Sequence, residues 1–347
     1  MQRTFRFNAI MAFIFLLTGC QISPRRGTIS NGGGGGGTGG QLYISTPSSI
    51  LHFNNAETAT GNVAPVSTIT GSSTQLSSPQ HLFLDTANDR LYVANQGGHS
   101  ILVFDGVSAL TGTLNLAPTR VISGASTNLV SPIDITLDPT NNLLYVADGT
   151  SILVFAGATT VTGNTPPVRN INMGVSIGGL FLDATNNQLY VSDPGDNAVD
   201  RLDSASTQNV IGIVGGAIAG PDTRLSQPRG LALDGSGRLL VSNSSTPASI
   251  TVYPNAGTAT GDAIPSVVIA ASGSTNNTLL QSPGQIALNR SVGTGELFVL
   301  DPLAASVLVF TNAPTNGGNI APARTINGGN TGITASAVNG LAIDPTR

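Results

Sequence analysis

Four side chains in this sequence have the chemistry that catalysis or ligand binding requires: His81, Asp134, Arg229 and Gln285. An imidazole can exchange a proton, a carboxylate can bind a cation, a guanidinium binds anions, and a carboxamide both donates and accepts hydrogen bonds. Each lies at the start of a short apolar segment that recurs along the chain, but the residue type changes from copy to copy. Because the repeat itself does not require these side chains, we expect them to bind a ligand.

Metal-dependent catalysis is the alternative interpretation, as a hydrolase or lyase with its site where these segments meet. Structural and catalytic zinc sites take three or four protein ligands, mostly His and Cys. The chain has three histidines; His52 falls in a column of apolar strand residues and His99 in a predicted turn, which leaves His81 alone. Asp134 could instead centre a site for calcium or another divalent metal, because hard cations prefer carboxylate oxygens. Otherwise we expect no cofactor.

Composition excludes several other functions. All 14 basic residues are arginine, so a P-loop lysine and a Schiff-base lysine are impossible. The formal net charge of −4 argues against nucleic acid as a partner. Charged residues make up only 9% of the chain, whereas apolar residues and Gly, Thr, Ser and Asn are abundant. This balance is typical of short strands joined by turns.

An internal repeat organises the chain from Gln41 onward, with a period of about 50 residues. A Leu-Tyr-Val-Ala-type strand has six copies, which begin at Leu42, Leu91, Leu144, Leu189, Leu239 and Leu297. A second apolar strand follows each, and a loop marked by Thr-Gly-Asn or a variant leads to a third. A fourth strand has six copies, which end at Asp85, Asp138, Asp183, Asp234, Asn289 and Asp344.

Four short apolar strands per unit predict a six-bladed β-propeller, in which each four-stranded blade buries its neighbours' faces. The strands are too short for an outer-membrane barrel, which needs about 9–11 residues per strand. The first strand of the repeat, at 41–46, is of the Leu-Tyr-Val-Ala type. The last, at 341–344, is a copy of the fourth strand, which precedes a Leu-Tyr-Val-Ala-type strand everywhere else in the repeat. We therefore predict that three N-terminal strands and one C-terminal strand share a blade and close the ring. The fourth strand of each unit should line the axis, which would bring the four candidates together.

A ring of polar residues ends the first strand of each unit: Thr46, Asn95, Asp148, Asp193, Asn243 and Asp301. Asp and Asn at strand ends commonly accept backbone N–H bonds and shape the turn. Because this ring recurs in every unit, we expect turn capping from it and no ligand contact.

Two further groups of charged residues suggest surface roles. Arg120, Arg169 and Arg324 share one position of the third strand, which is outermost in a propeller, and we predict that they form a solvated rim. A second group is dense in a chain otherwise poor in charge, and we interpret it as an interaction patch. Its members are Asp196, Asp200, Arg201, Asp203, Asp222, Arg224, Arg229 and Arg238.

The first 19 residues have the pattern of an export signal. Arg3 and Arg6 precede an apolar run over 7–17 that is too short to span a bilayer. The run ends in Leu-Thr-Gly-Cys at 17–20, which resembles the lipobox of bacterial lipoproteins. That resemblance implies cleavage before Cys20, the only cysteine, and its acylation. Residues 20–40 then form a lipidated, Gly-rich flexible linker, and Gln21 resembles the residue of lipoproteins sorted to an outer membrane.

The body from 41 to 347 carries a second resemblance. Pro228-Arg-Gly-Leu-Ala-Leu-Asp234, followed by Gly237-Arg-Leu-Leu-Val-Ser-Asn243, is similar to the NHL repeat. The resemblance implies a six-bladed propeller, and the other units match the repeat more loosely.

Together these features predict an exported, membrane-tethered binding module with no enzymatic activity. Its partner would be a protein, a glycan or a small ligand, bound at the axial face by His81, Asp134, Arg229 and Gln285. A purely structural envelope protein is the third interpretation.

Overall fold

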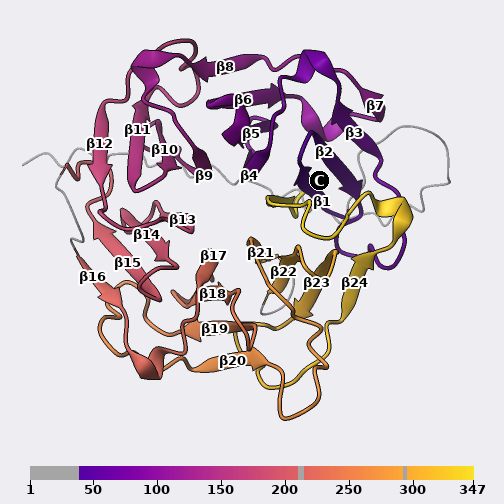
Figure 1. The fold of residues 1–347 in the computed structure, drawn as a ribbon, viewed down its shortest axis with the longest axis vertical. Helices are drawn as coiled ribbons and strands as arrows, with labels where there is room; N and C mark the ends of the chain where they lie inside the picture. Colours follow the sequence, from indigo (N-terminus) through magenta and orange to yellow (C-terminus); the bar gives the residue numbers. More distant parts are fainter. Residues whose placement is uncertain (1–38, 210–214, 292–294) are drawn as a thin grey trace, which may run out of the picture. The chain divides into compact units, whose positions relative to one another are not determined.

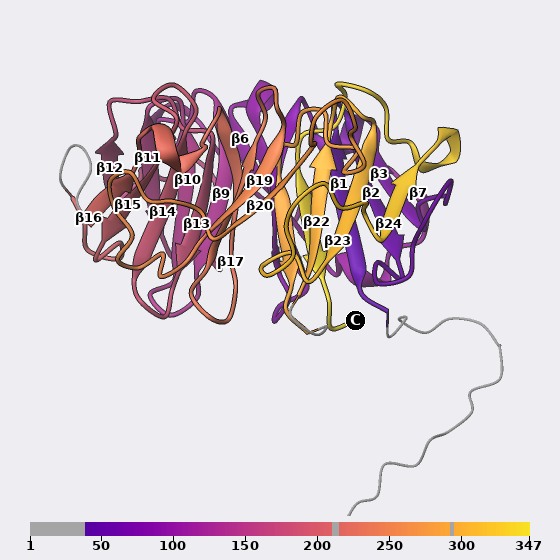
Figure 2. The same cartoon turned by 90° about the horizontal axis from the view of Figure 1, so that it is seen from below.

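The computed structural model describes residues 39–209, 215–291 and 295–347, all within the compact body Gly36–Arg347. The signal segment, Cys20 and nearly all of the linker lie outside the described residues. The body is a six-bladed β-propeller with four antiparallel strands in each blade (Figures 1 and 2), which confirms the predicted fold. In the part of the chain that is described, no helix is long and apolar enough to cross a membrane.

The blades are given from their innermost strand outward. Blade 1 consists of β25 (Leu341–Asp344), β1 (Gln41–Thr46), β2 (Ser49–Asn54) and β3 (Ser67–Thr70). Blade 2 consists of β4 (Pro79–Asp85), β5 (Arg90–Asn95), β6 (Ser100–Asp105) and β8 (Arg120–Ser123). Blade 3 consists of β9 (Pro132–Asp138), β10 (Leu143–Asp148), β11 (Ser151–Ala156) and β12 (Arg169–Asn172).

Blade 4 consists of β13 (Gly179–Asp183), β14 (Gln188–Asp193), β15 (Ala198–Asp203) and β16 (Gly215–Ile218). Blade 5 consists of β17 (Pro228–Leu233), β18 (Leu239–Asn243), β19 (Ser249–Tyr253) and β20 (Val267–Ala270). Blade 6 consists of β21 (Ile286–Asn289), β22 (Glu296–Asp301), β23 (Ser306–Thr311) and β24 (Arg324–Asn327). Short 3-10 turns lie in the connections after several strands, at Ser72–Thr74, Gln96–Gly98, Val107–Ala109, Ala125–Thr127, Pro221–Thr223 and Gly329–Thr331.

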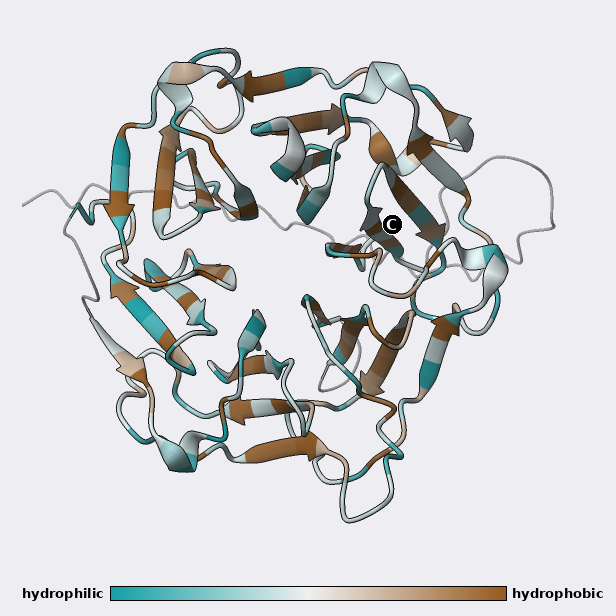
Figure 3. Ribbon diagram, viewed as in Figure 1, coloured by the Kyte–Doolittle hydropathy of each residue, from teal (hydrophilic) through white to brown (hydrophobic). Residues whose placement is uncertain are grey.

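The hydrophobic core is divided among the seams between successive blades. Each apolar cluster draws its members from two neighbouring blades; one joins Tyr92 of β5 to Leu144 of β10, and another joins Phe53 of β2 to Phe298 of β22. Figure 3 shows the apolar colouring concentrated along the strands. Because the middle strands bury both faces, each blade is stabilised by both of its neighbours.

The ring is closed by antiparallel pairing of β1 with β25. The register places Gln41 opposite Asp344 and Ile44 opposite Leu341, and the C-terminus lies beside β1 in Figure 1. Ser45 N also donates to Gly340 O at 3.0 Å. The predicted phase of the repeat is therefore confirmed, with three N-terminal strands and one C-terminal strand in one blade. Closure of this kind leaves no inner strand unpaired.

The Thr-Gly-Asn loop is hydrogen-bonded to the preceding blade. Gly61 forms a parallel bridge with Ile326 of blade 6, and Asn62 Oδ1 accepts a hydrogen bond from Asn330 N at 2.7 Å. Equivalent loops recur at Gly163 with Asn164, Gly261 with Asp262, and Gly318 with Asn319, and β7 (Gly112–Leu114) pairs with β3 in the same way. The sequence motif is thus an inter-blade contact as well as the marker of a third strand.

The predicted solvated rim of arginines is wrong. Arg120 Nη1 donates to the carbonyl oxygens of Ala158 and Val161 in blade 3, at 3.0 and 3.1 Å, and its guanidinium lies 5.5 Å from the Tyr92 ring centroid. Arg169 and Arg324 likewise donate to two carbonyls of the next blade. Among the described residues the carbonyls of Ala158 and Val161 receive no backbone N–H. One guanidinium group therefore donates to two such carbonyls at once.

Candidate functional site

The innermost strands position the candidate site. β4, β9, β13, β17, β21 and β25 contact one another in sequence around the axis, as predicted for the fourth strand of each unit. In β4 and β17 the ladder with the next strand is interrupted between Pro79 and Leu82 and between Pro228 and Leu231. Bulges of this kind re-aim side chains. They place His81 and Arg229 at the start of the strand, free of regular pairing.

Glycine lets neighbouring blades approach closely at this end of the axis. A Cβ at Gly340 would lie 2.2 Å from Gln80 O, and one at Gly179 would lie 2.5 Å from Arg229 O. Serine hydroxyls bridge the same backbones, since Ser45 Oγ donates to Gln80 O at 2.7 Å. The backbone that carries the candidate side chains is therefore fixed by the adjacent blade.

Asp134 is the centre of the axial face. Its side chain is 1% exposed, and its carboxylate accepts hydrogen bonds from its neighbour Ile135 N at 2.6 Å and from Leu180 N of blade 4 at 3.1 Å. His81 Nδ1 of blade 2 lies 2.5 Å from Oδ1, and Gln285 Nε2 just before β21 of blade 6 lies 3.0 Å from Oδ2. We call His81, Asp134 and Gln285 the axial cluster.

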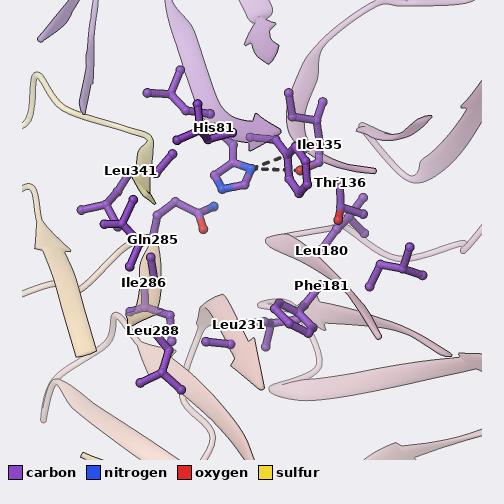
Figure 4. Close-up of a pocket in the computed structure, with 18 of the residues that line it drawn as sticks. His81, Ile135, Thr136, Leu180, Phe181, Leu231, Gln285, Ile286, Leu288 and Leu341 are labelled. Carbon is purple, nitrogen blue, oxygen red and sulfur yellow. Dashed lines mark hydrogen bonds between the residues drawn. The ribbon is translucent and has the colours of Figure 1, made fainter. Parts of the chain in front are cut away.

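The axial cluster spans the ring. Blade 6 is opposite blade 3 in the order of inner-strand contacts, so the hydrogen bond from Gln285 to Asp134 crosses the axis. Figure 4 shows the side chains of His81 and Gln285 pointing toward each other on one side of the cavity. Three of the four predicted site residues are thus brought into direct contact, although as many as 151 positions separate Asp134 and Gln285 in the sequence.

Arg229, the fourth candidate, lies in a pocket above the axial cluster. This axial pocket has a volume of about 330 Å³ and is lined by Gln80, His81, Ile133, Gly178, Gln227, Arg229, Ser244, Ser282, Pro283, Gly284, Gln285, Pro302, Val338 and Asn339. Arg229 is exposed, and no described residue pairs with its guanidinium. The lining contains carboxamides and hydroxyls but no carboxylate. A free cation among neutral hydrogen-bonding groups favours an anionic ligand.

A second cavity lies on the other side of the axial cluster. It has a volume of about 320 Å³, and apolar side chains of all six inner strands make up most of its wall. The two cavities share only His81 and Gln285. The axial cluster therefore separates a polar pocket from an apolar channel.

The axial cluster does not fit a divalent metal. In the described ranges, no group of three or more His, Cys, Asp or Glu side chains is placed to hold an ion. The Asp134 carboxylate is surrounded by N–H donors, which occupy the oxygen lone pairs that calcium would need. His81 Nδ1 also turns toward that carboxylate, so only its Nε2 remains for other partners.

The polar ring, which ends the first strand of each repeat unit (β1, β5, β10, β14, β18 and β22), caps turns as predicted. Asp148 accepts hydrogen bonds from Val130 N and Ser131 N at 2.7 and 2.9 Å. The other members likewise accept backbone N–H groups: Thr46, Asn95, Asp193, Asn243 and Asp301. All six are buried.

The predicted interaction patch is wrong for its central residues. Arg201 is only 7% exposed; it pairs with Asp203 at 2.9 Å and donates to Ala256 O and Ala259 O of blade 5. Arg201 lies on β15 and takes the role that Arg120, Arg169 and Arg324 have on the outer strands of their blades, since Gly216 of β16 stands opposite it. Asp222 and Arg224 are exposed, but Asp200 is buried.

The two other histidines do not contribute to the site. His52 is buried, stacks on Tyr43 at 4.5 Å, and has a pKa lowered to about 4 by burial, as expected for a packed strand residue. His99 lies in a turn and contacts Val130 O.

Comparisons with known proteins support the fold alone. No family model matches the chain. The protein SUPPRESSOR OF QUENCHING 1, chloroplastic, of Arabidopsis thaliana is 26% identical over 201 residues, which is 50% of this chain. The chain spans only 19% of that relative's length. The resemblance to the NHL repeat therefore stays a prediction.

Two solved structures have the same architecture. A chain of a nidogen/laminin complex matches with a TM-score of 0.58 and 16% identity, over 88% of this chain and 98% of that one. The periplasmic gluconolactonase of Pseudomonas aeruginosa matches with a TM-score of 0.56 and 13% identity, over 89% of this chain and 99% of that one. At these identities the likeness concerns the fold and not the activity.

Asp200 gives the body a specific pH dependence. Its carboxylate is buried with no hydrogen-bond partner among the described residues, and burial, with Asp193 and Asp196 nearby, raises its pKa to about 7. The corresponding positions of four other blades are leucine: Leu51, Leu102, Leu153 and Leu308. Because the folded-state pKa is above the unfolded value of 3.8, the contribution of this carboxyl group to stability falls as the pH rises from about 4 to about 7 and changes little above that.

We predict that Asp200→Leu raises the free energy of unfolding at pH 8 and removes a fall of about 1 kcal/mol per pH unit between pH 5 and 7. Denaturant unfolding across this range measures the effect. Asp200→Asn is the matched control, because it removes the charge but keeps the polar group, and it should also flatten the profile. Parallel pH profiles for the wild type and both variants would contradict the prediction.

Proposed function

We propose that this protein is a binding module, tethered outside the cytoplasm by a lipid on Cys20, whose axial pocket takes an anionic group. The group belongs to a small ligand, a glycan or a partner protein. The observation that carries the proposal is Arg229, an exposed guanidinium with no partner among the described residues, in a pocket without carboxylates.

Rigidity supports a role in binding. The backbone that presents Arg229 accepts a hydrogen bond from Ser192 Oγ at 2.6 Å, and the strand is bulged at that point. Gln285 is held by Asp134. A pocket whose walls are fixed before the ligand arrives loses little conformational entropy on binding. The amide and hydroxyl groups around Arg229 would then supply specificity.

The metal-dependent hydrolase or lyase is not proposed, because among the described residues no third His, Cys, Asp or Glu joins His81 and Asp134. His81 and Asp134 form a pair in which the carboxylate orients the imidazole, but the described lining offers no second acid or base for a general acid–base mechanism.

We predict that Arg229→Ala weakens binding of anions by about tenfold or more, the effect of losing one or two charge-assisted hydrogen bonds. Inorganic phosphate, citrate and glucuronate are titrated separately into the purified protein by calorimetry. Arg224→Asn is the control, because Arg224 is an exposed arginine outside the axial pocket with φ of 59°, a conformation that asparagine tolerates. The proposal fails if none of the three anions binds the wild type, or if both variants weaken binding equally.

The tether is tested independently of the pocket. We predict that Cys20→Ala abolishes incorporation of labelled fatty acid and moves the protein from the membrane fraction to the soluble fraction, because one thiol carries the attachment. Ser23→Ala is the control and should leave both readouts unchanged. A Cys20→Ala protein that still sediments with membranes and still takes up label would refute the anchor.

A further inference from the structure

We propose that the apolar channel behind the axial cluster is a second binding site, for a small neutral molecule with an apolar body and one hydroxyl group. This site shares only His81 and Gln285 with the Arg229 pocket, and the proposal does not depend on the function of that pocket. The channel wall comes from all six inner strands and includes Phe83, Phe181, Leu288 and Ile343.

The wall argues for an apolar body. Of the residues that line the channel, only His81, Thr136, Gln285 and Arg290 have polar side chains, and Thr136 is 6% exposed. An apolar body that packs against these Leu, Ile and Phe side chains is removed from water and gains affinity. The volume of about 320 Å³ lies at the lower end of the range for small-molecule sites.

The axial cluster argues for the hydroxyl group. Asp134 is bound by His81 Nδ1 and Gln285 Nε2, so these nitrogens carry the protons. In the neutral imidazole His81 Nε2 is then a hydrogen-bond acceptor, as is Gln285 Oε1, and both side chains face the cavity in Figure 4. A ligand that reaches this end of the channel is therefore best matched by an O–H donor.

The opposite mouth argues for a neutral ligand. Arg290 lies there, lining both the channel and the adjoining hollow that contains Asp183 and Asp234. The other inner strands end at the same face in Asp85, Asp138 and Asp344. Arg238 pairs with Asp234 and Arg347 with Asp344. Asp85, Asp138 and Asp183 have no arginine partner among the described residues, so carboxylates still exceed the charge of Arg290. This excess disfavours an organic anion, and the apolar wall disfavours a cation without a partner. The channel and the axial pocket thus select different ligands.

Titration of p-cresol, toluene and p-toluate by NMR tests the proposal, since the three differ only in the polar group. We expect p-cresol to bind saturably, toluene to bind about tenfold more weakly, and p-toluate not to bind. Absence of saturable p-cresol binding, or equal binding of toluene, would overturn the proposal.

Variants locate the bound molecule. Ala287 of β21 stands at the same register as Phe83 and Phe181, so Ala287→Phe fills the channel with a residue that two other blades already hold there. It should abolish p-cresol binding, and Ala287→Leu should weaken it. Gln285→Leu should narrow the difference between p-cresol and toluene. Arg229→Ala should leave p-cresol binding unchanged, which separates this test from the anion test. Unchanged p-cresol binding in both Ala287 variants would overturn the proposal.

Discussion

The antiparallel pairing of β1 with β25 is the contact on which the rest of the structure depends. An inner strand has one hydrogen-bonded neighbour in its blade, and β25 obtains its neighbour only from the opposite end of the chain. That pairing completes blade 1, and blade 1 contributes to the apolar seams on both of its sides. Asp134 binds groups from blades 2, 4 and 6 at once, which is possible only in a closed ring.

Closure also explains why the molecule has two different cavities. Side chains from nearly opposite blades meet at the axis, and the hydrogen bonds to Asp134 hold them across it. One side of this cluster is polar and carries the exposed guanidinium of Arg229, whereas the other has a wall of mainly apolar side chains with His81 and Gln285 at one end. A chain with 9% charged residues thereby offers two sites of different chemistry, because a few polar side chains are concentrated at one level of the axis.

The repeat made the strands, their order, the closing phase and the capping ring predictable, because these features follow from residues that recur in every unit. It also identified the four axial residues as exceptions to the repeat. It could not predict that Gln285 reaches Asp134, because the approach depends on channel width and side-chain length. The roles of Arg120 and Arg201 were missed for a related reason: their acceptors are carbonyl groups, which have no signature in the sequence. The Asn that recurs in the Thr-Gly-Asn motif could have predicted the hydrogen bonds between this loop and the preceding blade.

Native-state hydrogen exchange on the full-length protein tests the closed ring most directly. If β25 is an integral strand of blade 1, its amides become exposed only when the whole ring unfolds. Their exchange should then give the same free energy of opening as the amides of the central strand β10, and both should change together when denaturant is added. Exchange of β25 about 100-fold or more faster than β10 would mean that the C-terminal strand detaches on its own. That result would contradict the account of how the axial site is held.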